Sequence, residues 1–405
     1  MKGKIILMLS VLATLSWQAQ TKILFDATKA ETAGNADWVI DADIHNLKFT
    51  ATGISTTGTE SNPQRIPAPA QSGITAATPE TYWQGALSYW GIDLVKKGYV
   101  VETLPYNGNI TYGNPSNPQD LSNYKVFVVV EPNIRFTAAE KTAMLNFVAN
   151  GGGLFMVSDH TVSDRNSDGW DSPAIWNDFF TSNGVINDPF GISFNLNNVS
   201  LLTSNFAPAS MNPTILAGPQ GVPTQMKFSN GATMTLNKNN NASAQGLIFT
   251  EGSSTSGSTN VMFATSTYGN GKICALGDSS VPDDGTGDPN DTLYNGYAGD
   301  ANGNHRPLLV NAVIWLASSS SLGVHDLVMK PEAVVYPNPA TDYVQVQNQN
   351  KQFKTYKILD ESGKETGSGT LSENGNINIQ YLPVGIYYLI LQSDKEIQST
   401  KLFKK

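Results

Sequence analysis

A series of short, largely apolar segments constrains the fold of this chain more than any other feature. Five of them occupy residues 23–25, 99–104, 126–130, 154–157 and 273–276. Such runs are typical of parallel strands that are buried on both faces. Helical patterns lie between them, and a capping box from Thr137 to Glu140 predicts a helix over 138–149. The alternation predicts an α/β domain with a doubly wound, mainly parallel sheet.

We expect this domain to span residues 21–323. Residues 189–265 differ in texture, because short polar strands alternate with loops rich in Asn and Ser. We interpret this stretch as a β-rich insertion or an extra β-layer. A serine run at 318–321 and Pro331 predict a linker over residues 324–333.

The composition excludes several kinds of stabilisation and one class of partner. The chain has 405 residues with 25 Lys and Arg against 34 Asp and Glu, a net charge of −9. That balance argues against nucleic acid, which requires clustered positive charge. Cys274 is the only cysteine, so neither an intrachain disulfide nor a cysteine-based zinc site is possible. Stability must then come from the size of the core or from bound metal ions.

The first 20 residues have the pattern of a signal peptide. Lys2 and Lys4 precede an apolar stretch over residues 5–15, which is too short to span a bilayer. The alternative interpretation is a buried first strand. No later segment reaches about 18 consecutive apolar residues, so we expect a secreted protein without a membrane span.

Residues 334–405 alternate apolar and polar positions in short runs separated by turn signals, which predicts a small antiparallel β-sandwich. The motifs are Tyr336-Pro-Asn-Pro-Ala with Asp342, then Leu382-Pro-Val-Gly-Ile-Tyr, then Lys401-Leu-Phe-Lys-Lys. Together they resemble the C-terminal sorting domain of type IX secretion cargo. The resemblance implies a Bacteroidetes-type source and export by the type IX machinery through the periplasm to the surface or the medium. It also implies removal of this domain at the surface. A carbohydrate-binding sandwich is the alternative.

The middle of the chain resembles class I glutamine-amidotransferase-like domains of the trehalose-utilisation type. The resemblance covers about residues 80–320 and depends on the order of strand, capped helix, Asn150-Gly-Gly-Gly, strand, and Tyr268-Gly-Asn-Gly-Lys-Ile-Cys-Ala-Leu-Gly-Asp. It implies a flavodoxin-like, amidotransferase-like scaffold. Enzymes of that superfamily often carry a nucleophilic cysteine after the third strand. The corresponding stretch here is Val130-Glu-Pro-Asn-Ile-Arg, so thiol chemistry is excluded and Cys274 is assigned to core packing.

Acidic residues follow the predicted strands. The first 20 residues carry two positive charges and residues 334–405 carry one, which leaves −12 for residues 21–333. Sites in open α/β sheets form at the carboxyl ends of strands. The predicted catalytic residues at those ends are Asp26, Glu131, Asp159, His160 and Asp278. Acids gathered there repel one another unless a cation or shared protons compensate. The alternative is that each acid caps a following helix.

The segment from Asp164 to Asp171 predicts a calcium site. Oxygen-bearing side chains alternate and then a glycine follows, as in the first half of an EF-hand loop. The predicted ligands are Asp164, Asn166, Asp168, the Trp170 carbonyl and Asp171. Position 12 of such a loop is Ile175 rather than Glu, so the motif is incomplete. The alternative is an Asx-rich turn that binds no ion.

Two further groups of residues are predicted to contact substrate. Ser279, Asp283 and Asp284 follow the strand at 273–276. The segment from Asp300 to His305 repeats the style downstream, and it either holds further ligands or is merely a turn. Near the start of the chain the candidates are Asp37, Trp38 and Asp41, with Asp43 and His45 close by. Trp38 offers a face for a sugar, although such aromatics are more often part of the core.

These observations favour a secreted hydrolase that acts on a glycan or glycoconjugate by carboxylate and histidine acid–base chemistry in a calcium-supported site. A metal-assisted phosphoesterase, esterase or amidase is the nearest enzymatic rival. The alternative from another class is a non-catalytic, calcium-dependent glycan-binding protein of the cell surface. A third possibility is that the acidic loops only bind stabilising calcium ions. No serine lies in a G-x-S-x-G elbow, which argues against a serine hydrolase.

Overall fold

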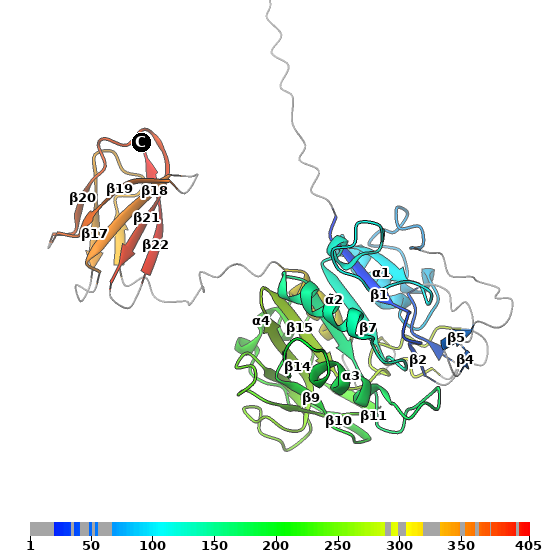
Figure 1. Cartoon of the computed structure of the whole chain (residues 1–405). Coiled ribbons are helices and arrows are strands. Elements are labelled where there is room, and N and C mark those ends of the chain that lie inside the picture. The colour runs from blue at the N-terminus through cyan, green and yellow to red at the C-terminus, as the bar shows by residue number, and fades with distance from the viewer. Residues whose placement is uncertain are drawn as a thin grey trace, which may run out of the picture. The chain divides into compact units, whose positions relative to one another are not determined.

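The chain divides into two compact units between Leu322 and Gly323. The computed structural model (Figure 1) describes residues 20–33, 36–40, 48–50, 53–55, 67–287, 293–298, 305–318, 333–348, 353–360, 364–372, 374–393 and 397–405. The predicted signal peptide and the predicted linker lie outside these residues, apart from Gln20 and Ala333. Among the described residues no helix is long and apolar enough to cross a membrane.

Five parallel strands form the centre of the first unit. They are β1 (Lys22–Asp26), β6 (Val100–Leu104), β7 (Val126–Val130), β8 (Gly153–Val157) and β15 (Gly271–Leu276), in the order β6-β1-β7-β8-β15. The chain steps from β1 to β6 in one direction and then from β7 to β15 in the other. The winding therefore reverses between β1 and β7, which is the place where doubly wound sheets open a crevice.

The region from 189 to 265 extends this sheet instead of forming a separate layer. Antiparallel strands β14 (Val261–Tyr268), β12 (Met234–Leu236) and β9 (Ile192–Phe194) follow β15 in order, and β13 (Gln245–Phe249) pairs with β14. Strands β10 (Val199–Thr203) and β11 (Met226–Gly231) form a separate ribbon. The sheet is therefore mixed, with its parallel half carrying the strand-end acids.

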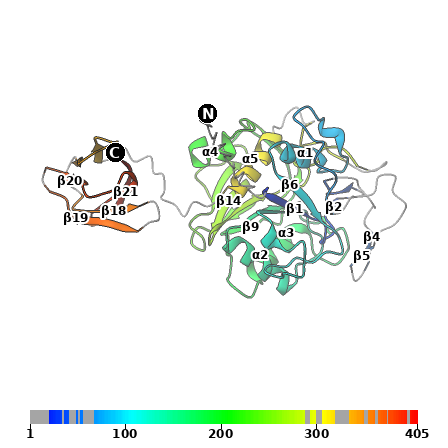
Figure 2. The same cartoon turned by 90° about the horizontal axis from the view of Figure 1, so that it is seen from above.

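Helices cover both faces of the sheet, as Figure 2 shows. One face carries α1 (Ser88–Lys96), α4 (Pro213–Leu216) and α5 (His305–Ala317), and the other carries α2 (Ala138–Ala149) and α3 (Ser172–Thr181). The capping box at the start of α2 forms as the sequence predicts, with both reciprocal bonds between Thr137 and Glu140. Between the layers Trp90 packs edge-on against Phe25 and Phe155. Three layers with a buried parallel sheet confirm the predicted α/β class.

The remaining elements of the first unit are short. They are β2 (Thr32–Ala33), β3 (Ala36–Asp37), β4 (Lys48–Thr50), β5 (Gly53–Ser55), η1 (Glu80–Tyr82), η2 (Leu121–Asn123) and η3 (Ala209–Met211).

The second unit is an antiparallel β-sandwich, as predicted. One sheet has the order β16-β17-β20 and the other β19-β18-β21-β22. The bounds are β16 (Ala333–Tyr336), β17 (Tyr343–Asn348), β18 (Thr355–Asp360), β19 (Glu365–Thr370), β20 (Asn376–Asn378), β21 (Gly385–Gln392) and β22 (Ile397–Lys404). Val344 and Ile377 of the first sheet share one core with Ile358 and Leu389 of the second.

Candidate functional site

Three carboxyl groups interact at the carboxyl edge of the parallel strands. Glu131 follows β7, Asp159 lies just after β8, and Asp278 lies just after β15. All three residues are buried, with exposed fractions of 0%, 4% and 1% respectively. Each of these acids is within electrostatic reach of the others. The sheet thus brings together three acids that lie far apart in the sequence. We call Glu131, Asp159 and Asp278 the carboxylate cluster.

Glu131 has the most constrained conformation in the cluster. Its backbone φ is 48°, in the left-handed region, which is costly for a residue other than glycine and recurs at functional sites. Its Oε2 accepts hydrogen bonds from Trp38 Nε1 at 3.1 Å and from Ser279 Oγ at 2.6 Å. Its Oε1 accepts from Arg165 Nε at 3.2 Å. Three donors from distant parts of the chain therefore fix the position of this carboxyl group.

Arg165 joins Glu131 to Asp159. Its Nη2 lies 3.1 Å from Glu131 Oε1 and 3.1 Å from Asp159 Oδ2. Burial raises the pKa of Asp159 well above its ordinary value, and the charges of Glu131 and Asp278 raise it further against the opposing effect of Arg165. Burial and the neighbouring carboxyl groups therefore favour the protonated form of Asp159.

His160 lies at the rim of the cluster. Its Nε2 is 3.6 Å from Asp159 Oδ2. Its Nδ1 lies 2.5 Å from the Thr161 carbonyl and 3.2 Å from Asn198 Nδ2. The ring is therefore held in place by its neighbours and stands next to the predicted acid.

Asp278 is held by backbone and hydroxyl donors. Oδ1 accepts from Ser280 N at 2.8 Å and from Ser280 Oγ at 2.6 Å, and Oδ2 accepts from Ser229 N. Burial raises the pKa of Asp278 to about 6, although these hydrogen bonds oppose the rise. This acid thus has a firm structural role in joining the β15 end to β11.

Asp26 forms a second acidic pair with Glu31, a residue that the sequence analysis did not single out. Asp26 accepts hydrogen bonds from Thr28 N and Thr28 Oγ1, and Glu31 Oε2 accepts from Lys29 N at 2.9 Å. Burial raises the pKa of both groups, and the charge of Asp26 adds to the rise at Glu31. The two carboxyl groups interact, so the protonation of one depends on the charge of the other.

The predicted calcium loop folds as a network of Asx turns. Asp164 accepts from the backbone amides of Asp168 and Gly169, and Asp168 accepts from Trp170 N. Asn166 donates to the Asn133 carbonyl. Asp171 caps α3 through Ala174 N and also accepts from Thr161 Oγ1. The network supplies the turn expected of the alternative interpretation, while calcium stays a prediction.

The predicted substrate-binding acids after β15 accept hydrogen bonds from their own loop and from the start of α1. Asp284 accepts from Tyr89 N at 2.8 Å and from Thr286 N at 2.8 Å, and Asp283 accepts from Gly285 N at 2.8 Å. Burial raises the pKa of Asp284 to about 7. Asp37 and Trp38 are buried, with exposed fractions of 3% and 1%. Trp38 therefore presents its N–H to Glu131 instead of an open face, and Asp41, Asp43, His45 and Asp300 lie outside the described residues.

Within the described part of the chain, no three His, Cys, Asp or Glu side chains are arranged so that they could hold a metal ion. The carboxylate cluster instead has an arginine as its cation. Its arrangement suits proton transfer, because an acid with a raised pKa and a carboxyl group fixed by three donors both contact one guanidinium.

The main residue that sequence reasoning missed is Arg165. It is one of only four arginines in the chain, and it lies in the acidic loop directly after a strand end. The sequence signal that could have identified Arg165 is a rare arginine that lies close to several acidic residues. Arg306 repeats the pattern, because its Nη2 lies 2.7 Å from Glu80 Oε1 and close to Asp93.

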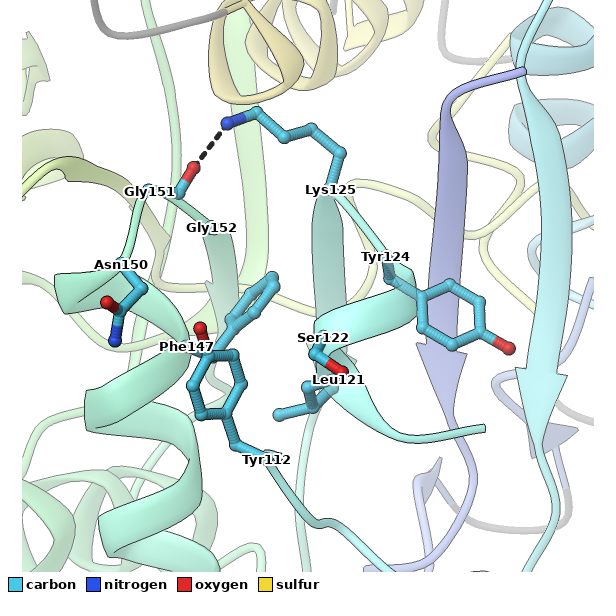
Figure 3. A pocket seen from close by; sticks show the side chains of 9 residues that line it. All are labelled: Tyr112, Leu121, Ser122, Tyr124, Lys125, Phe147, Asn150, Gly151 and Gly152. Atoms are coloured by element: carbon cyan, nitrogen blue, oxygen red, sulfur yellow. Dashed lines mark hydrogen bonds between the residues drawn. The ribbon is translucent and has the colours of Figure 1, made fainter. Parts of the chain in front are cut away.

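A cavity of about 110 Å³ lies at the opposite edge of the sheet (Figure 3). Lys125, directly before β7, donates from Nζ to the Gly151 carbonyl, and the Tyr112 and Phe147 rings meet with their centroids 6.4 Å apart. Since Glu131 follows the same strand that Lys125 precedes, the cavity is separate from the carboxylate cluster.

Comparison with known families identifies the second unit. A family described as the secretion system C-terminal sorting domain matches residues 334–405. This part of the chain is therefore a sorting domain of the type IX secretion system, and the protein is secreted or displayed on the cell surface. A comparison with curated proteins finds no relative.

Solved structures resemble this chain only loosely. The mmIFT52 N-terminal domain has 13% identity and a TM-score of 0.38, and the overlap covers 73% of this chain and 98% of that one. A beta-galactosidase from Bacillus circulans has 12% identity and a TM-score of 0.30, over 76% of this chain and 38% of that one. A ThuA-like protein from Parabacteroides merdae has 13% identity and a TM-score of 0.28, over 58% of this chain and 87% of that one. TM-scores as low as these do not establish a common fold.

Proposed function

We propose that residues 21–323 form a secreted hydrolase that acts on a glycan or glycoconjugate, with Glu131 and Asp159 as its acid–base pair. The observation that carries the proposal is the position of Arg165 Nη2, 3.1 Å from a carboxylate oxygen of each. The left-handed backbone at Glu131 supports it, because strain of this kind collects where a side chain must be aimed.

The two groups suit different roles. The raised pKa of Asp159 suits it to donate a proton to a leaving group. Glu131, held by Trp38, Ser279 and Arg165, is the fixed carboxylate that acts as base or nucleophile. Both bridged oxygens lie 3.1 Å from one nitrogen, so they are closer together than the carboxyls of inverting glycosidases, which are about 6.5–9.5 Å apart. The spacing favours the retaining route.

Access to the pair depends on the loop that carries Arg165. Glu131 is fully buried, whereas the Arg165 side chain is 28% exposed. A substrate therefore reaches Glu131 only when Arg165 is displaced. The position of the cluster beside the reversal between β1 and β7 also supports the finer expectation of a flavodoxin-like scaffold.

The second candidate is a non-catalytic, calcium-dependent glycan-binding protein of the cell surface. The observation that favours it is the complete burial of Glu131 with both of its oxygens hydrogen-bonded. In that case the carboxylate cluster fastens β7, β8 and β15 together and performs no chemistry.

Glu131→Gln and Asp159→Asn test the proposal. Each variant of the full chain is incubated with a panel of oligosaccharides and glycoconjugates, and released products are separated by chromatography. We expect each change to lower the rate by at least about 100-fold, the order found for acid–base groups. Asp120→Asn is the control, because it alters a well hydrogen-bonded carboxylate elsewhere in the domain. Turnover that survives in both variants contradicts the proposal. Binding without product release by the unaltered chain favours the second candidate.

A further inference from the structure

A second cavity opens between α4, the β13–β14 pair and α5. Its volume is about 250 Å³. Thr267, which lines it, pairs with Lys272, the second residue of β15, whereas Asp278 follows the last residue of that strand. The cavity therefore lies toward the amino ends of the parallel strands, away from the carboxylate cluster.

The lining mixes polar and apolar groups and carries no ionisable side chain. Hydroxyl and amide groups surround the space, together with one indole and a thioether. The polar and aromatic groups used below are Asn212, Ser243, Gln245, Thr265, Thr267 and Trp315. The nearest cation is Lys272 Nζ, which lies 5.2 Å from the Trp315 ring and already donates to the carbonyls of Trp315 and Ser318. The side chains that line the cavity therefore favour a neutral polar molecule.

Two of these groups have hydrogen-bonding capacity that the protein does not use. Thr265 is only 3% exposed, and among the described residues its hydroxyl has no hydrogen-bond partner. The Gln245 amide contacts only Met211 Sδ, at 3.3 Å, which is a weak acceptor. The Thr265 hydroxyl is not among the fully buried side-chain atoms that lack a partner, so it stays accessible and is free to pair with a ligand hydroxyl.

The walls of the cavity are fixed before any ligand arrives. Ser243 Oγ donates to the Thr267 carbonyl and accepts from Thr267 N at 2.9 Å, which holds the loop before β13 against β14. On the opposite side the buried Asn311 of α5 donates to the carbonyls of Ile215 and Gly221. The α4 wall and α5 therefore keep a constant spacing, as binding with little loss of entropy requires.

Trp315 supplies the apolar surface. It is half-buried at the end of α5, and Lys272 Nζ lies 5.2 Å from the centre of its ring while donating to the Trp315 carbonyl. An indole offers a flat, apolar contact that suits the C–H face of a sugar ring. Amide and hydroxyl groups around the indole can pair with the equatorial hydroxyl groups of a sugar that lies on it.

We propose that this cavity is a binding subsite for a neutral sugar unit, with Trp315 as its apolar platform and Thr265 and Gln245 as its hydroxyl-recognising groups. The subsite needs no catalysis, so it goes beyond the proposed hydrolase. It supplies the chain with a second glycan contact on the far edge of the sheet from Glu131 and Asp159.

The test is a binding titration of the full chain with neutral hexasaccharides of glucose, mannose and xylose, followed by tryptophan fluorescence and calorimetry. Thr265→Val removes only the hydroxyl, and Gln245→Leu removes the amide at a half-buried position. Thr181→Val is the matched control, because Thr181 is exposed on α3. We expect at least one hexasaccharide to bind, and Kd to rise tenfold or more in each cavity variant and to stay unchanged in Thr181→Val.

The proposal is overturned if no neutral hexasaccharide binds, if only an acidic one such as hexagalacturonate binds, or if both cavity variants bind as the unaltered chain does. Melting curves of each variant show whether it is folded, and Gln245→Leu decides if Thr265→Val is not. Glu131→Gln separates the two proposals, since it should abolish turnover and leave this binding intact.

Discussion

Ser279 Oγ donates a hydrogen bond of 2.6 Å to Glu131 Oε2, although 148 residues separate the two in the sequence. Ser279 follows β15 and Glu131 follows β7, and β8 lies between those strands in the sheet. The bond therefore ties the carboxyl ends of non-adjacent strands across the carboxylate cluster. This hydrogen bond can form only when the carboxylate cluster has assembled.

Removing this bond should destabilise the first unit. Ser279→Ala leaves a fully buried carboxylate short of one donor, which costs about 1–3 kcal/mol of unfolding free energy. Urea unfolding followed by tryptophan fluorescence measures it, because all seven tryptophans precede residue 316. Ser256→Ala, at an exposed serine, is the control and should change the stability by less than about 0.5 kcal/mol. Equal midpoints for the two variants would show that the bond contributes nothing.

Arg165 should be coupled energetically to Glu131. Arg165→Met leaves two buried acids facing each other, and we expect a loss of about 2 kcal/mol, below the 3–5 kcal/mol of a fully buried pair because the guanidinium is partly exposed. Arg165→Lys should recover only part of it, since an ammonium lacks the planar fork. The measurement is a double-mutant cycle of Arg165→Met with Glu131→Gln. Additive losses would contradict the bridge.

The stability of the first unit should be greatest at mildly acid pH. Burial raises the pKa of Asp278 to about 6 and of Asp284 to about 7, so the folded state binds these protons more tightly than the unfolded state. Unfolding free energy then falls as pH rises from about 4 to 7. The contribution of Asp284 is of the order of 4 kcal/mol, since its pKa rises from 3.8 to about 7 and a tenfold change in proton affinity is worth about 1.4 kcal/mol.

The loss of stability at low pH has a different origin. Although burial acts in the opposite direction, hydrogen bonds from Ser122 and Thr111 lower the pKa of Asp120 to about 2. Stability from this group is present above its unfolded pKa and is lost as pH falls from about 4 toward 2. Urea unfolding at pH 2.5, 4.5 and 8 tests the loss of unfolding free energy at both low and high pH. Asp284→Asn should reduce only the loss between pH 4.5 and 8. A stability that keeps rising from pH 5 to 8 would refute the assignment.

Calcium should stabilise the 164–171 loop if the sequence prediction holds. Millimolar Ca²⁺ is expected to raise the melting temperature of the first unit, because extracellular sites bind in that range. Chelation with EDTA should reverse the rise, and Asp164→Asn with Asp168→Asn should abolish it. Mg²⁺ is the control ion. An unchanged melting temperature would leave the Asx-turn network as the whole role of the loop.

The outline of the fold was predictable because its signals are local. The apolar run at 126–130 became β7 with every residue buried, and the box at Thr137 became the start of α2. The alternating pattern after residue 333 became a sandwich with a single core. The extension of the sheet by β14, β12 and β9 was not predictable in that form, because antiparallel pairing depends on partners far away in the chain.

The candidate site was likewise predictable only in part. Sequence placed Glu131, Asp159 and Asp278 at strand ends, and periodicity together with the known geometry of parallel sheets was sufficient for that. It could not show that Asp26 turns to Glu31 or that Trp38 is buried with its N–H on Glu131. Those choices depend on side-chain direction and burial, which no local pattern encodes.

By itself the sequence determined the secretion address, the α/β class and the acidity of the strand ends, since each is written in consecutive or periodic residues. Only the tertiary structure decided which acids share a cation. Arg165 reaches Glu131 and Asp159 because β7 and β8 are neighbours in the sheet and the following loop folds back across them. Hydrogen bonds of about 3 Å depend on positions in space, and residues distant in sequence acquire those positions only when the sheet forms.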